Sequence, residues 1–358
     1  MFHFQSNFIV YKCDFNEKMD LLRIRIRILR KVRYVVIIAA ICILCVCFFR
    51  HKKHNLPLQY ILCSPQYWAE ELDEGFEGFD NTTGAYGGQY IIPNYVHFLR
   101  YGPKLKEVSF VDAVNILAAF KNQKPDKIIF HTNIDSFTGK FWRYLTSLPK
   151  FNETIVFKYI EPIDSIFGRK MYSKYRDWHS SDILRIEILQ KYGGIFIDND
   201  VYVVQKLDRF RRYEMVLETI ADLENFGTMT LMAHKGARFL RLWLNEYKEY
   251  YPHLWYYNAG KRAKLKVLDV RPELVHDARG KFGVEDLRTE LYLQKWKQWK
   301  DKYTIHTLIR HLHDRDDLRY NNLNLTYPVV FDQYNILKYN VTIKDMILDC
   351  CKELVFLE

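Results

Sequence analysis

Glycine and proline are scarce in this sequence, and internal repeats are absent. Among 358 residues there are 15 Gly and 10 Pro, too few for collagen or low-complexity sequence. Apolar residues make up 49% of the chain, which excludes global disorder and is enough for a sizeable core. The length fits one large or two modest domains.

An excess of positive charge is also missing from most of the chain. The formal net charge is +10, but residues 1–54 hold 11 Lys and Arg against 3 Asp and Glu. The remaining residues hold 42 basic and 40 acidic side chains. A nucleic-acid-binding face would need the excess on the folded part, so we expect no nucleic-acid partner. The sequence does not indicate the oligomeric state.

One apolar run explains the basic N-terminal end. Residues 35–49 carry no charge, and Tyr34 extends the run to 16 residues, slightly short of the roughly 17–25 of an ordinary spanning helix. Six Lys and Arg lie within residues 23–33 before it and three lie within residues 50–53 after it, and this bias places the N-terminus in the cytosol. A cleaved signal peptide is the alternative, but no A-x-A-like site follows. We therefore expect a signal anchor, and a short span suits the early secretory pathway.

Cysteines and glycosylation sequons agree with a luminal C-terminal part. Only Cys63, Cys350 and Cys351 follow the apolar run, so a disulfide scaffold is excluded and Cys63 can pair with either of the other two. Four N-x-T sequons follow the run and none precedes it, at Asn81, Asn152, Asn324 and Asn340. We expect a single-pass type II glycoprotein.

The pattern along the chain predicts an α/β fold. We expect a cytosolic tail over residues 1–33, the transmembrane anchor over 34–49, a stem over 50–89 and a luminal domain over 90–358. Strands and helices alternate in the luminal part, which indicates a mostly parallel sheet covered on both faces. The expected strands lie within 90–99, 127–130, 154–159, 195–197 and 227–233, and the expected helices span 109–120, 180–191 and 237–250.

The most informative segment runs from residue 180 to residue 204. A helix with Ser180 or Ser181 at its start leads through a Gly-Gly turn into a short apolar strand, which ends at Asp198-Asn199-Asp200. Ligands of open α/β sheets bind at the carboxyl ends of strands. Two carboxylates there can hold Mg²⁺ or Mn²⁺ and leave coordination positions for phosphate and water. An ordinary Asp- and Asn-rich turn is the alternative for this tripeptide alone.

Two residues of the preceding helix belong to the same edge of the predicted sheet. Asp182 and Arg185 are three positions apart and share a helix face. The chain runs down the helix and back up the strand, so the start of the helix and the end of the strand lie at one edge. Taken alone, the pair also reads as a surface ion pair at a helix start.

Together these residues carry a family resemblance. The pattern S-D-x-x-R-x-x-x-L-x-x-x-G-G-x-x-x-D-x-D, running from Ser181 to Asp200, resembles the DXD sugar-binding region of glycosyltransferase family 32. That family includes Golgi α-1,4-galactosyltransferases and α-1,4-N-acetylglucosaminyltransferases. The segment Pro93 to His97 resembles its first strand, and the short signal anchor is shared.

The resemblance implies a GT-A-like, Rossmann-type fold, a nucleotide-sugar donor and a divalent cation, usually Mn²⁺. It implies that Asp200 binds the metal, that Asp198 contacts the metal or the donor ribose, and that Asp182 and Arg185 contact the donor sugar. His97 is carried over as a donor contact. His306 is a candidate for the diphosphate or the metal, with an ordinary structural histidine as the alternative. A UDP-sugar, a glycan or glycolipid acceptor, retention of configuration and a Golgi membrane location are also implied.

The chain departs from the family where the acceptor is chosen. Relatives carry H-Q-G-P where this chain has residues 255–260, so the acceptor is not carried over. Trp243, Trp255, Tyr256, Tyr257, Trp296 and Trp299 are candidates for stacking on sugars, with core packing as the alternative for most of them. A metal-dependent hydrolase and a non-catalytic sugar-binding protein remain alternative functions. No H-E-x-x-H, G-x-S-x-G or P-loop motif supports the hydrolase.

Overall fold

The computed structural model describes residues 79–220, 224–309 and 331–358. All of them belong to the second of two compact units, which spans residues 75–358. The predicted tail, the predicted anchor over 34–49 and most of the predicted stem lie outside the described residues, as do Cys63 and Asn324. Within the described part, no helix is long and apolar enough to cross a membrane.

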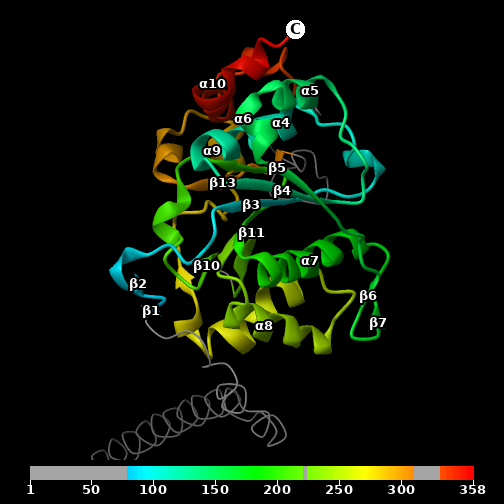
Figure 1. The fold of residues 1–358 in the computed structure, drawn as a ribbon, viewed down its shortest axis with the longest axis vertical. Helices are drawn as coiled ribbons and strands as arrows, with labels where there is room; N and C mark the ends of the chain where they lie inside the picture. Colours follow the sequence, from blue (N-terminus) through cyan, green and yellow to red (C-terminus); the bar gives the residue numbers. More distant parts are fainter. Residues whose placement is uncertain (1–78, 221–223, 310–330) are drawn as a thin grey trace, which may run out of the picture. The chain divides into compact units, whose positions relative to one another are not determined.

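A seven-stranded sheet forms the centre of this unit (Figure 1). Its strand order is β12-β10-β11-β8-β3-β4-β5. Four of the six pairings are parallel, and β11 pairs antiparallel with both β10 and β8. The predicted mixed α/β fold with a mostly parallel sheet is therefore confirmed. The strands are β3 (Tyr95–Leu99), β4 (Lys127–Thr132), β5 (Ile155–Tyr159), β8 (Gly194–Ile197), β10 (Met215–Thr219), β11 (Phe226–Ala233) and β12 (His276–Asp277).

Short strand pairs lie beside this sheet. They are β1 (Phe79–Asp80) with β2 (Gly84–Ala85), β6 (Ser165–Ile166) with β7 (Arg169–Lys170), and β9 (Val201–Val203) with β13 (Thr304–His306). The first pair, with the buried Asn81 hydrogen-bonded to Glu214 and Glu273, shows that the folded unit begins before the predicted boundary at residue 90.

Helices cover both faces of the sheet (Figure 1). On one side lie α7 (Arg176–Tyr192) and α8 (Arg238–Asn245), and on the other lie α4 (Phe110–Ala118), α5 (Lys140–Ser147), α6 (Pro149–Thr154), α9 (Arg288–Tyr292) and α10 (Thr342–Val355). The strands serve both layers because successive side chains point to opposite faces. In β8, Ile195 and Ile197 pack into the core under α4, whereas Phe196 packs into the core under α7.

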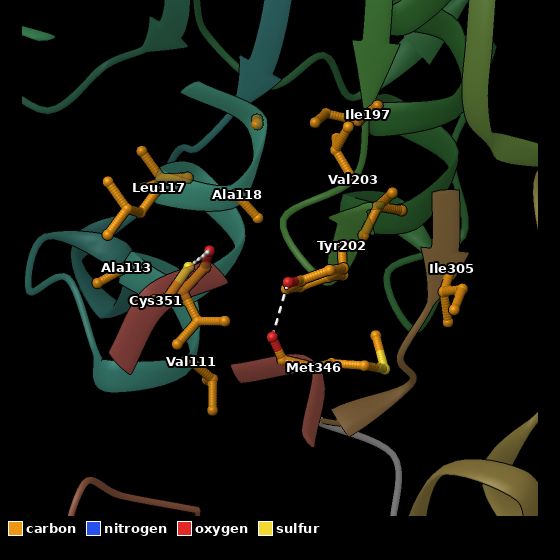
Figure 2. Packing of buried hydrophobic residues seen from close by; sticks show 14 of the residues in the cluster. Val111, Ala113, Leu117, Ala118, Ile197, Tyr202, Val203, Ile305, Met346 and Cys351 are labelled. Atoms are coloured by element: carbon orange, nitrogen blue, oxygen red, sulfur yellow. Dashed lines mark hydrogen bonds between the residues drawn. The ribbon is translucent and has the colours of Figure 1, made fainter. Parts of the chain in front are cut away.

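The helix α4 is more deeply buried than its sequence predicts. Ser109 caps it, and a capping box with Asp112 fixes its start. An amphipathic helix was expected, but all nine residues of α4 are buried. The reason is α10, which packs against α4 and brings Cys351 Sγ to 3.6 Å from Val114 O. Figure 2 shows this layer, where Tyr202 donates a hydrogen bond of 2.8 Å to Met346 O.

The helix α7 begins four residues earlier than predicted. It starts at Arg176, so Asp182 lies in its second turn and not its first. Neither predicted cap acts as one, because both serine hydroxyls bind other groups. Ser180 Oγ accepts from the backbone N of Ile163, and Ser181 Oγ accepts from Arg185. The predicted end at the Gly193-Gly194 turn is confirmed.

Candidate active site

The end of β8 positions the acidic tripeptide. All four residues of β8 are buried between two layers of helices, and Asp198 follows directly. The turn before the strand requires glycine. Gly194 has a φ of +109°, and a Cβ there would lie 2.7 Å from His97 Nε2 and 2.7 Å from a backbone oxygen. This turn lets α7 run back along β8, so that Asp182 and Arg185 reach the end where Asp198 lies.

Arg185 joins the predicted site residues. Its Nη2 lies 3.2 Å from Asp182 Oδ1, and its Nη1 lies 3.3 Å from Asp198 Oδ2. The guanidinium also donates to Thr228 O and Thr228 Oγ1, at 2.7 and 3.0 Å, and lies 5.1 Å from the centre of the Phe196 ring. The side chain is only 6% exposed. Its position is thus fixed by several contacts, which prepares it to orient a bound ligand.

Burial sets the charge of this group. It raises the pKa of Asp182 to about 7, while Arg185 lowers it and the negative charge of Asp198 adds to the rise. Burial likewise raises the pKa of Asp198, against the opposing effect of Arg185. Asp182 Oδ2 is buried and accepts no hydrogen bond from any described residue. A buried oxygen of this kind is uncommon, and it could accept a hydrogen bond from a ligand hydroxyl.

Asp200 and His306 form the other half of the site. His306 Nε2 lies 3.4 Å from Asp200 Oδ1, because β13 pairs with β9 and places His306 opposite Val201. The backbone of Asp200 is held by Thr307, whose N and Oγ1 both donate to its carbonyl oxygen. Burial is the largest influence on His306 and disfavours the charged imidazole, but the carboxylates of Asp200 and Asp198 together outweigh it and raise the pKa of His306. We call Asp182, Arg185, Asp198, Asp200 and His306 the Asp–Arg cluster.

The middle residue of the tripeptide is held by groups that the sequence did not reveal. Asn199 Oδ1 accepts from Arg100 Nη1 at 3.4 Å, and its Nδ2 donates to Leu99 O at 2.8 Å. Asn115 of α4 donates to Asn199 O at 3.0 Å. Arg100 itself is fully buried and forms a 3.1 Å ion pair with Asp112. Of these, only Asp112 had a sequence signal, the capping box that begins with Ser109.

His97 is not part of the Asp–Arg cluster, which corrects the prediction that it contacts the donor. Its ring is fully buried, with Nδ1 3.0 Å from His131 Nε2 and Nε2 2.8 Å from Gly193 O. Gly193 precedes β8 whereas Asp198 follows it, so His97 faces the other end of the strand. Burial lowers the pKa of His97 to about 4, which makes it a neutral structural residue.

The other predicted positions divide by burial. The amide of Asn81 is buried and donates a hydrogen bond to Glu273 O. This position leaves no room for a glycan, which corrects the prediction that Asn81 is glycosylated. Asn152 and Asn340 are exposed. Trp243 and Trp299 are core residues, whereas Trp255 is 49% exposed.

The cluster fits a cation that is shared with a ligand. Across residues 79–220, 224–309 and 331–358, no group of three or more His, Cys, Asp or Glu is arranged to hold a metal by itself. The side chains of Asp198 and Asp200 are 26% and 12% exposed, so both carboxylates are partly open to solvent. Carboxylate oxygens are the ligands that Mg²⁺ and Mn²⁺ prefer, and such sites are completed by phosphate and water.

Comparison with known proteins identifies the class of this region. Residues 112–217 match the family described as "Glycosyltransferase sugar-binding region containing DXD motif". The match runs from α4 to β10 and contains Asp182, Arg185 and the Asp198–Asp200 tripeptide. The resemblance inferred from the sequence is therefore confirmed for this region.

Individual relatives are more distant. Glucan organizing enzyme 1 of Cryptococcus neoformans var. grubii is 24% identical over 181 residues, which is 46% of each chain. An uncharacterized protein of Arabidopsis thaliana is 26% identical over 113 residues, 32% of this chain and 17% of its own. The match thus spans less than half the length of either curated relative.

Solved glycosyltransferases also overlap with the structure. PaToxG glycosyltransferase covers 49% of this chain and 69% of its own, with 18% identity and a TM-score of 0.34. The galactosyltransferase LgtC, solved with donor and acceptor sugar analogs, covers 48% and 69%, with 13% identity and a TM-score of 0.33.

Proposed function

We propose that this protein is a metal-dependent glycosyltransferase that moves a hexose or N-acetylhexosamine from a nucleotide sugar, a UDP-sugar, to a glycan or glycolipid acceptor. The observation that carries the proposal is the Asp–Arg cluster. At the carboxyl end of β8, Asp182 and Asp198 meet the guanidinium of Arg185, and Asp200, two residues after Asp198, meets His306; all five were chosen from the sequence pattern alone. That edge is where α/β sheets bind ligands.

Each residue of the cluster has a role in this reaction. The acceptor oxygen bonds to the anomeric carbon, the bond from that carbon to the diphosphate breaks with its electron pair left on the diphosphate, and the acceptor proton is released. Asp198 and Asp200, with His306 as a further candidate, would share a Mn²⁺ or Mg²⁺ with the donor diphosphate, and the ion would supply Lewis-acid stabilisation of that charge. Asp182 and Arg185 orient the donor sugar. A carboxyl with a pKa of about 7 can donate to or accept from a sugar hydroxyl.

Topology, stereochemistry and acceptor belong to the same proposal. The family resemblance supports retention and a Golgi location, and the charge bias around residues 34–49 supports a type II anchor with residues 90–358 in the lumen. One curated relative is named for organizing glucan, so glucan oligosaccharides belong among the acceptors to be tested.

The test is a donor panel with full-length protein in detergent. Hydrolysis of UDP-Gal, UDP-GlcNAc, UDP-Glc and GDP-Man is measured with Mn²⁺, and again with EDTA. We expect slow turnover of one UDP-sugar, lost in EDTA and restored by Mn²⁺. Asp200→Ala should lower turnover by about 100-fold or more, since a Lewis acid is worth several kcal/mol.

A matched variant controls for loss of surface charge. Asp349 pairs with Lys300 at the surface, its side chain is 54% exposed, and Asp349→Ala should keep full turnover. Turnover that persists in EDTA would refute the proposed dependence on a metal ion. Preference for GDP-Man would refute the uridine donor. A protein that binds donor and never turns it over, even with acceptors, would favour the non-catalytic alternative.

A further inference from the structure

Four aromatic side chains gather on the surface beside the Asp–Arg cluster. Tyr172, Tyr175 and Trp178 come from the start of α7 and the loop before it, and Trp255 comes from the segment after α8. Ring centres lie 5.4 Å apart for Trp178 and Trp255, 6.0 Å for Tyr175 and Trp255, and 5.7 Å for Tyr172 and Tyr175. We call these four residues the aromatic rim.

The rim is open to solvent. Trp178 is 46% exposed, Trp255 is 49% exposed and Tyr172 is 38% exposed. Large aromatic side chains are well buried on average, and a contiguous apolar surface that remains exposed marks a binding site more often than scattered single residues do. Four side chains are too few for a stable protein interface, which buries about 800 Å² on each partner.

The helix α7 connects the rim to the cluster. Trp178 lies four residues before Asp182, so both belong to one face of α7, one turn apart. His179 stacks on Trp255 with ring planes 3° apart and hydrogen-bonds Tyr250 through its Nδ1. A ligand on the rim is therefore about one helical turn from the residues proposed to hold the donor sugar.

The backbone after α8 directs Trp255 outward and its neighbour inward. Tyr256 has a φ of +62°, in the left-handed region that costs a non-glycine residue energy. Its hydroxyl donates to Phe226 O at 2.6 Å, and its ring packs where a Cβ on Gly260 would stand. Strain of this kind gathers at functional sites, because the surrounding structure must enforce it.

We infer that the aromatic rim is the acceptor subsite, where Trp178 and Trp255 stack on a hexopyranose ring of the acceptor glycan. The inference rests on the proposed function. A pyranose ring presents C–H groups on its faces, which release water when they pack on an aromatic ring, while its hydroxyls stay at the edge within reach of Trp and Tyr donors. Sugar transfer needs the acceptor hydroxyl beside the donor sugar, and the rim is in that position.

The test compares acceptor use by Trp178→Ala, Trp255→Ala and the double variant, all as full-length protein in detergent. The probes are lactose, chitotriose, laminaritriose and mannotriose. Binding is measured by saturation-transfer NMR, and KM and kcat by transfer from the donor that the panel identifies. We expect each single variant to raise the acceptor KM about tenfold with a much smaller change in kcat, since one aromatic contact is worth about that much. Equal thermal midpoints show that the variants are folded.

Phe356→Ala is the matched control, because Phe356 is 68% exposed at the end of α10 and should not affect binding. The inference is overturned if no probe binds the wild-type protein, if both Trp variants bind as well as wild type, or if they instead abolish self-association measured by light scattering. If wild-type protein hydrolyses a donor but binds no probe, the inference that the aromatic rim is the acceptor subsite is refuted and the proposed function is not. Protein that binds a probe through the rim but turns over no donor refutes the proposed enzyme.

Discussion

Replacing Asp182 with Asn separates the stability of the Asp–Arg cluster from its chemistry. Asp182 is 3% exposed, one of its oxygens faces Arg185 and the other lacks a hydrogen bond among the described residues. Burial raises its pKa from 3.8 to about 7. A carboxyl with a raised folded-state pKa holds a proton that the unfolded chain has already released. Its stabilising contribution is therefore present at low pH and lost as pH rises to about 7.

The magnitude follows from these values. At pH 5 the folded protein holds the Asp182 proton and the unfolded chain does not, whereas at pH 8 neither does. One pH unit in that window is worth about 1.4 kcal/mol, so this group lowers the free energy of unfolding by about 3 kcal/mol between pH 5 and pH 8. Asn has no proton to lose. Asp182→Asn should therefore gain about 3 kcal/mol relative to wild type over this range.

The assay is urea unfolding followed by tryptophan fluorescence at pH 5 and pH 8. Both proteins keep Asp198 and His306, so most of their own pH dependence cancels in the difference. The carboxylate of Asp345, with its side chain 44% exposed, provides the control, and Asp345→Asn should show a much smaller change. A difference between Asp182→Asn and wild type that is the same at both pH values would refute the reasoning. Sugar transfer should be lost whatever the effect on stability.

Three further outcomes are expected. Asn199→Asp keeps an acceptor for Arg100 but replaces the 2.8 Å hydrogen bond to Leu99 O with repulsion between two oxygens. Turnover should therefore fall about 10–100-fold in the donor assay. A change in thermal midpoint without a change in turnover would contradict this expectation. Gly194→Ala should lower the free energy of unfolding by about 2 kcal/mol or more, about twice the effect of Gly236→Ala. Both glycines have a positive φ, but a Cβ on Gly236 (φ +74°) would meet no atom within 4 Å, and equal urea midpoints for the two variants would count against this expectation. Protein from animal cells should lose mass on peptide N-glycosidase treatment, and Asn152→Gln should reduce that loss; no mass shift in either protein would argue against the luminal orientation.

The sequence predicted the elements that depend on local patterns. The apolar run before Asp198, the Gly-Gly turn and the i,i+3 spacing of Asp182 and Arg185 are visible within 20 residues, and the structure brings these groups together. The predicted start of α7 was wrong because Ser180 and Ser181 are residue types that often cap helices, but here their hydroxyls bind Ile163 N and Arg185. A capping side chain is recognised by its hydrogen bond, and only coordinates supply that.

Contacts between distant segments could not be predicted from one sequence. His97 was assigned to the donor from a motif, yet its ring fills the space beside Gly194 and hydrogen-bonds Gly193 O at the far end of β8. The complete burial of α4 depends on α10, more than 220 residues later. Arg100 looked like any charged residue after a strand, and its buried ion pair with Asp112 appears only when β3 and α4 are placed side by side.

The Asp-Asn-Asp tripeptide shows why the middle position of this motif is constrained in this chain. Asp198 to Val201 form a hydrogen-bonded turn, in which Val201 N donates to Asp198 O at 3.1 Å, and this turn gives the two carboxylates and the amide different partners. The two carboxylates meet Arg185 and His306, while the amide fills its hydrogen bonds with Arg100 and Leu99 O. An amide both donates and accepts here, which a carboxylate or an alkyl group cannot do. The residues that hold Asn199 therefore fix the backbone from which both carboxylates project, and the precision of the proposed metal site depends on them.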